Sequence, residues 1–159
     1  MESFYQGSPN ARLLTDRFRI PVERAVSAHF GWEWRVREFS DMHDLASHPA
    51  AVLSDGRAPV FVKLSEAAHG KDQFEAELAG LRLLADLAGV LTPAPVGVVE
   101  VESGVILILE GVQAVERGPQ QWREIGRTLA RIHQVKGGQF GLDRQGYFGP
   151  LYQDNRPAP

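Results

Sequence analysis

The spacing of apolar and polar residues changes several times along the chain, and each change marks a predicted element. Residues 21–31 (PVERAVSAHFG) begin with a Pro suited to a first helical turn, repeat apolar residues at helical intervals and stop at Gly31. They predict a short helix. Residues 32–39 (WEWRVREF) alternate apolar and charged positions, which is typical of a half-buried strand. Residues 1–20 have no clear pattern and receive no assignment.

Two hairpins are predicted by turn signals between apolar runs. AAVLS and APVFVKL are separated by Asp55-Gly56, a pair that accommodates the positive φ angles of tight turns. VGVVEVE and VILILE are separated by Ser103-Gly104. Together with residues 32–39, these runs predict four or five antiparallel strands interrupted by one helix.

That inserted helix carries an acidic residue on its apolar side. Asp72 and Glu75 suit an N-terminal capping box. The apolar positions recur at steps of three, four and seven, and they are Phe74, Leu78, Leu81, Ala85 and Ala88. Glu77 falls inside this stripe. A carboxylate on the packed face of a helix is costly unless it is paired, so Glu77 needs a cationic partner.

Lys63 is the predicted partner, because an ammonium in an apolar strand carries the same cost. Alternation places it on the face of Phe61, opposite Val60, Val62 and Leu64. Two interpretations follow. Glu77 holds Lys63 toward the α- and β-phosphates of ATP, as a helix glutamate and a strand lysine do in kinases. Alternatively, Lys63 extends its ammonium into water from the end of the strand, with Glu77 at the edge of its helix.

The last third of the chain begins with another pattern open to two interpretations. The apolar run GVILIL is followed by Glu110 and Gly111, which fits either a hinge that presents backbone groups to adenine or an edge strand that ends in a loop. Residues 119–136 then predict a helix that starts at Pro119. Its apolar face consists of Trp122, Ile125, Leu129 and Ile132. His133 adjoins that face, where a packing role is the commoner one.

Composition removes several function classes. The 159 residues contain 17 Lys and Arg against 20 Asp and Glu, without a basic stripe for nucleic acid. Cysteine is absent, and the five histidines lack metal-ligand spacing, so no metal ligands are assigned in the chain. GVILIL is too short to span a bilayer, and the N-terminus lacks a signal-peptide pattern. A cytoplasmic globular protein is therefore expected.

Several of these segments, taken in order, resemble the fructosamine (ketosamine-3-) kinases, relatives of the aminoglycoside phosphotransferases. They are VFVKL, FEAELAGLRLLA, VILILEG, IGRTLARIHQV and FGLDRQGYFGPLYQDN. The resemblance implies a protein-kinase-like fold and ATP-dependent phosphorylation, with magnesium, of a sugar hydroxyl on a glycated amine or amino sugar. It assigns phosphate contact to Lys63, its helix partner to Glu77, and the adenine-binding hinge to residues from Glu110 to Val112.

Two features depart from the family pattern. The stretch EFSDMHDLASHPAAVL, where kinases usually cover the phosphates with glycines, contains no Gly and carries Asp41 and Asp44, which would repel phosphate. Ser40, Ser47, His43 and His48 remain as donors. The chain also ends before an HGD-type catalytic loop. HGKD at 69–72 is interpreted as a connection followed by the helix cap Asp72, so no catalytic residue is assigned, and the catalytic Asp and magnesium ligands are expected beyond Pro159.

The sequence therefore predicts an α+β protein-kinase-like N-lobe: a twisted antiparallel sheet of about five strands with one packed helix. A hinge and the first helix of an otherwise missing helical C-lobe follow. The predicted parts are residues 1–31 (an extension with a short helix), 32–112 (the N-lobe) and 113–159. The chain alone would carry only the nucleotide-binding half of the kinase. The alternative is a truncated non-catalytic module that binds a partner or self-associates through an exposed helix 119–136.

Overall fold

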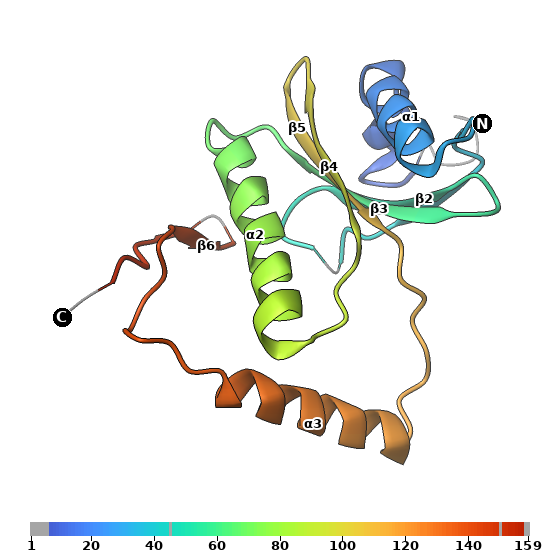
Figure 1. Cartoon of the computed structure of the whole chain (residues 1–159). Helices are drawn as coiled ribbons and strands as arrows, with labels where there is room; N and C mark the ends of the chain where they lie inside the picture. The colour runs from blue at the N-terminus through green and yellow to red at the C-terminus, as the bar shows by residue number, and fades with distance from the viewer. Residues whose placement is uncertain (1–6, 45, 150, 158–159) are drawn as a thin grey trace. The chain divides into compact units, whose positions relative to one another are not determined.

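A computed structural model describes residues 7–44, 46–149 and 151–157, which form two compact units (Figure 1). The first unit extends as far as Phe74 and resumes over Pro93–Val112. The second contains Glu75–Thr92 and the chain from Gln113 onward. The sequence-based division at residues 31 and 112 stays a prediction.

The first unit contains a five-stranded antiparallel sheet with the order β1-β2-β3-β5-β4. Strands β2, β3, β4 and β5 are labelled in Figure 1. Its strands are β1 (Glu38–Asp41), β2 (Ala50–Ser54), β3 (Pro59–Ser65), β4 (Pro95–Val101) and β5 (Gly104–Glu110). The predicted sheet of about five antiparallel strands is confirmed. Strands β3 and β5 pair with each other at its centre although α2 (Gly70–Ala88) separates them in sequence.

The two faces of β3 differ as the alternation predicts. Val60, Val62 and Leu64 are buried and join one apolar core with residues of α1 (Asp16–Phe30). Phe61 and Lys63 are half-buried on the other face. The strand therefore turns its apolar side toward α1 and its lysine away from it.

Helix α1 begins five residues before the predicted start at Pro21, which lies inside it. Phe18, Val22 and Val26 recur every fourth residue and are buried, so packing extends the helix back across a proline that lacks a hydrogen-bond donor. The short 3-10 helix η2 (Ala11–Leu14) precedes α1. The predicted end is confirmed, since Gly31 adopts a left-handed conformation with φ of 76°.

The segment before β1 has the burial of a strand without its pairing. Trp34 and Val36 are buried as the alternation predicts, but β1 starts only at Glu38. Side chains of α1 accept the hydrogen bonds that a neighbouring strand would accept: Ser27 Oγ from the Trp34 N–H at 2.9 Å, and Glu23 Oε1 from the Val36 N–H at 3.0 Å. The predicted strand 32–39 is thus wrong for most of its length.

Both predicted hairpins are present. Gly56 has a φ of 88°, and Asp55 accepts hydrogen bonds from the N–H groups of Arg57 and Ala58. Burial alone would raise the pKa of Asp55, but these hydrogen bonds and one from the Trp32 indole lower it. In the second hairpin Gly104 is the first residue of β5, and a Cβ there would lie 2.1 Å from the Ser65 carbonyl oxygen.

Helix α2 starts at Gly70, so Asp72 lies in its first turn and is not the predicted cap. Gly70 lies so close to Ser65 that a Cβ would come within 2.5 Å of Ser65 Oγ, so the approach of this helix end to β3 requires glycine. The Gly70 N–H also donates to the Ala67 carbonyl at 2.9 Å. In the first turn the carboxylate of Asp72 still interacts favourably with the helix dipole.

The second unit contains α3 (Pro119–Gln134) and a short hairpin. Helix α3 begins at the predicted Pro119 and ends before the predicted residue 136; Gln121 Oε1 accepts a hydrogen bond from the Gly118 N–H at 3.1 Å. Strands β6 (Gly146–Phe148) and β7 (Leu151–Gln153) pair in antiparallel fashion. Their pairing was not predicted, because three-residue strands are too short to establish a period.

Candidate nucleotide site

Lys63 lies on β3, where its register partner on β2 is Ala50. Its Nζ lies 5.7 Å from the centroid of the Phe74 ring, close enough for a cation–π interaction. Phe74 is buried near the start of α2, and its ring centroid also lies 5.7 Å from that of His48. The structure therefore brings together Lys63, Phe74 and His48, a predicted phosphate-loop donor.

Glu77, the predicted partner of Lys63, lies on α2 one turn after Phe74. It belongs to the second compact unit, whereas Lys63 and Phe74 belong to the first. The pairing of Glu77 with Lys63 stays a prediction. The role of Phe74 beside the lysine was missed, because the sequence had assigned that residue only to the apolar face of its helix.

The predicted hinge follows β5 and is fixed by backbone hydrogen bonds. The Glu110 N–H donates to the Ala94 carbonyl at 2.8 Å, and the Gly111 N–H donates to the Pro59 carbonyl at 2.8 Å. A Cβ at Gly111 would lie 2.8 Å from Pro59 Cβ, so this position requires glycine. Val112 is exposed. The adenine-binding role of Glu110 and Val112 stays a prediction.

The Glu110 side chain has a partner that sequence analysis missed. Glu110 Oε1 lies 2.8 Å from Nε2 of His29, in the last turn of α1. The two residues are 81 positions apart, and no local pattern connects them. This contact ties the C-terminal end of α1 to the end of β5.

Asp41, at the end of β1, is the most heavily hydrogen-bonded carboxylate near the predicted phosphate loop. It accepts hydrogen bonds from Ser8 Oγ, from the Asn10 N–H and side-chain amide at 3.0 and 2.7 Å, and from the His43 N–H at 2.9 Å. Burial alone would raise the pKa of Asp41, but these hydrogen bonds lower it to about 2. The Asp41 carboxylate, whose charge is predicted to repel phosphate, is therefore hydrogen-bonded to residues 8–12, which we call the N-terminal segment.

The rest of this loop is more open. Asp44 is 83% exposed and lies 3.0 Å from His43 Nε2. Ser47 Oγ is 3.1 Å from His48 Nδ1, so two of the predicted donors contact each other. Leu45 lies outside the described residues.

The family resemblance also implies magnesium. Among the described residues, no three His, Asp or Glu side chains cluster in a way that would hold a metal ion. The described part of the chain therefore does not fit a magnesium site.

No described helix is both long and apolar enough to cross a membrane.

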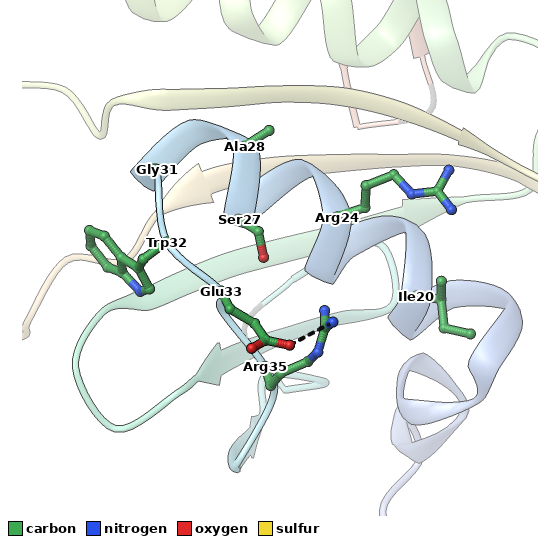
Figure 2. Close-up of a pocket in the computed structure, with 8 residues that line it drawn as sticks. All are labelled: Ile20, Arg24, Ser27, Ala28, Gly31, Trp32, Glu33 and Arg35. Atoms are coloured by element: carbon green, nitrogen blue, oxygen red, sulfur yellow. Dashed lines mark ion pairs between the residues drawn. The ribbon is translucent and has the colours of Figure 1, made fainter.

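A cavity of about 570 Å³ lies on the α1 side of the sheet, lined by residues of α1 and the segment 31–35 (Figure 2). Arg35 in its wall is already paired, at 3.0 Å with Glu33 and at 3.6 Å with Glu23. The Trp32 ring stacks on Phe30, with centroids 4.7 Å apart. Because Lys63 faces the other side of the sheet, this cavity is separate from the candidate nucleotide site.

Comparison with known proteins identifies the class. A crystal structure from Haemophilus somnus is described as a candidate fructosamine-3-kinase. The match covers 87% of this chain and 47% of the chain in that crystal structure, with a TM-score of 0.76 at 22% identity. A second from Thermobifida fusca, described in the same way, matches 86% and 46% with a TM-score of 0.64 at 26% identity. The sheet and helices thus belong to the protein-kinase-like fold.

Sequence comparison then gives the family. Residues 20–158 match the fructosamine kinase family model, and the chain belongs to that family. It is 29% identical to a probable ketoamine kinase of Pasteurella multocida, over 84% of this chain and 47% of the relative. A probable ketoamine kinase of Synechocystis is 27% identical over 84% and 45%. The chain spans about half the length of these relatives.

Proposed function

We propose that this chain supplies the nucleotide-binding half of a cytoplasmic, ATP-dependent kinase that phosphorylates a sugar hydroxyl of a glycated amine. Membership of the fructosamine kinase family supports the kinase class and a small-molecule substrate. The observation that carries the site proposal is the position of Lys63. Its ammonium lies over the Phe74 ring on the sheet face away from α1, rather than being extended alone from a strand end.

In this proposal Lys63 contacts the α- and β-phosphates, and Glu77 orients it. Helical spacing supports Glu77, since residues three apart project from the same side of a helix and Phe74 is already beside Lys63. An ammonium that is both stacked and paired keeps one extended conformation. Such preorganisation lowers the cost of binding a phosphate group.

The adenine base is proposed to bind the Glu110 carbonyl and the Val112 N–H. Support comes from the hydrogen bonds of Glu110 and Gly111 to Ala94 and Pro59, which hold this backbone in a defined position. The Glu110–His29 contact keeps the carboxylate of Glu110 at α1. The backbone of residues 110–112 then binds the base, while the Glu110 side chain contacts α1.

The acceptor-orienting Asp and the magnesium ligands are proposed to lie outside these 159 residues. In HGKD, Asp72 belongs to the first turn of α2 and lies 3.9 Å from His69 Nδ1, so it is not proposed as catalytic. When bound, magnesium would neutralise charge on the phosphates. No step of the transfer is assigned to residues of this chain.

Calorimetric titration with MgATP tests the site. The unaltered chain is expected to bind, and Lys63→Ala is expected to lose most of that affinity because the phosphates lose their cation. Lys71→Ala is the matched control, since Lys71 is a nearby exposed lysine whose Nζ lies 2.7 Å from Glu100. Equal affinity in the chain and in Lys63→Ala, or no binding by either, would rule out the role of Lys63.

A second candidate is a non-catalytic module that binds through α3. The observation that favours it is the exposure of Trp122, Ile125 and Leu129, at 56%, 38% and 50%. The coding sequence beyond Pro159 separates the two candidates. An in-frame continuation with an HGD-type loop and a later Asp supports the kinase, whereas a stop codon supports the module.

A further inference from the structure

Asn10 connects the ends of two strands from outside the sheet. Its side-chain amide donates to Asp41 Oδ1 at 2.7 Å and to the Ala50 carbonyl at 3.0 Å, and its N–H donates to Asp41 Oδ2 at 3.0 Å. Asp41 is the last residue of β1, and Ala50 is the first residue of β2. Asn10 itself is only 5% exposed. We call these three hydrogen bonds the Asn10 bridge.

The Asn10 bridge ends beside the lysine of the candidate site. Ala50 is fully buried and is the register partner of Lys63 across β2 and β3. The Ala50 carbonyl also accepts the Met42 N–H at 3.0 Å, so it joins the bridge to the first residue after β1. Asn10 thereby contacts β1 and β2 directly, and it is linked to β3 through Ala50.

The stretch that is expected to cover the phosphates contains no glycine. A Gly-rich turn lets several backbone N–H groups approach phosphate, but residues 38–53 contain no Gly and place Asp41 there instead. Ser8 and Asn10 donate hydrogen bonds to that carboxylate. Its negative charge is thus held by the N-terminal segment, and the backbone at Ala50 is fixed next to Lys63.

We propose that Asn10 is a positioning residue for the phosphate end of the nucleotide site. It keeps the Asp41 carboxylate bound to the N-terminal segment and sets the position of the strand that flanks Lys63. The inference rests on the proposed function, because it concerns the same nucleotide.

The test compares MgATP with adenosine, which lacks phosphates. In Asn10→Ala the Kd for MgATP is expected to rise about tenfold, because binding must then order the region that these hydrogen bonds hold in place, while the Kd for adenosine stays unchanged. In the absence of nucleotide, the amide protons of Met42 and His43 should exchange faster, since both are bonded within the bridged region. Arg12→Ala is the control, because Arg12 also joins the N-terminal segment to the sheet unit, through Glu66 at 2.7 Å.

The possible results separate the inference from the proposed function. An unchanged MgATP affinity in Asn10→Ala, or an equal loss of MgATP and adenosine affinity, would overturn the inference while the function stands. An unaltered chain that binds neither ligand overturns the function and the inference with it. If Asn10→Ala does not fold, Asn10→Ser is judged by the same criteria, since its hydroxyl is too short to reach both Asp41 and Ala50.

Discussion

Glu23 Oε1 accepts a hydrogen bond from the Val36 N–H at 3.0 Å, and this bond joins α1 to the segment that leads into β1. Glu23 is 3% exposed, and both of its carboxylate oxygens lie 3.0 Å from Arg19 Nη1. A buried carboxylate with a cation and a backbone donor is fully satisfied. Its removal leaves the buried Val36 N–H without its acceptor and takes away one of the two carboxylates that pair with Arg19, the other being Asp16 at 2.6 Å.

We therefore expect Glu23→Ala to lower the free energy of unfolding by about 2 to 4 kcal/mol. Glu33→Ala is the control, because Glu33 also pairs with Arg35, at 3.0 Å, but is 76% exposed. Its effect should stay within about 0.5 kcal/mol. Urea denaturation of both variants measures the difference, and equal midpoints would show that the Val36 hydrogen bond contributes nothing to stability.

The decrease in the free energy of unfolding at low pH should depend on Asp41. Its pKa is lowered from 3.8 to about 2, so the stabilisation is complete above about pH 4 and is lost as pH falls toward 2. Over that range the unaltered chain should lose on the order of 1 kcal/mol more than Asp41→Asn, since solvent screening reduces the full effect. Denaturation at several pH values measures this. Asp44→Asn, at an 83% exposed position, should behave like the unaltered chain; parallel curves for all three chains would contradict the prediction.

Two glycines of α2 should respond to alanine in opposite directions. A Cβ at Gly70 would lie 2.5 Å from Ser65 Oγ and 2.7 Å from Ser65 Cβ, whereas a Cβ at Gly80 meets nothing within 4 Å. Gly70→Ala should therefore destabilise the fold by about 1 to 3 kcal/mol through overpacking. Gly80→Ala should stabilise it by up to about 1 kcal/mol, because alanine is the better helix former. Thermal unfolding checks both signs, and a neutral Gly70→Ala would mean that the β3–α2 connection can shift.

The exposed face of α3 should cause self-association of the isolated chain. Leu129→Glu places a charge in the centre of that face and should weaken a dimer at least about tenfold, because burying an unpaired carboxylate is costly. Arg123→Glu changes the charge at an exposed polar position of the same helix and serves as the control. Sedimentation velocity over a range of concentrations gives the comparison. A chain that remains monomeric throughout would refute the prediction.

Patterns of residues close in sequence predicted most of the sheet. Asp55-Gly56 and the apolar runs around it gave the β2–β3 hairpin, and alternation gave the two faces of β3, since both depend on neighbouring residues. The start of α1 was missed because Pro21 is a strong local signal that the packing of Phe18 and Val22 outweighs. Residues 32–37 were misassigned because period-two burial does not reveal whether the backbone pairs with a strand or with side chains of a helix.

The residues of the candidate site also differ in whether the sequence alone reveals them. Lys63 was recognisable because a charge in an apolar strand is anomalous by itself. Asn10 and His29 were not, since each acts through a contact that only the folded chain creates, with Asp41 and with Glu110. No local pattern distinguishes a bridging asparagine from one in a surface turn.

The position of β3 between β2 and β5 also sets an order for synthesis. A nascent chain that has emerged only as far as α2 contains the residues of β1, β2 and β3, but β5, the partner of one edge of β3, has not yet been made. That edge consists of the backbone N–H and C=O groups of residues 60–65, which pair with β5 in the complete sheet. Open edges of this kind pair readily with other chains. A nascent chain that ends before Glu110 therefore exposes a strand edge that the complete sheet covers.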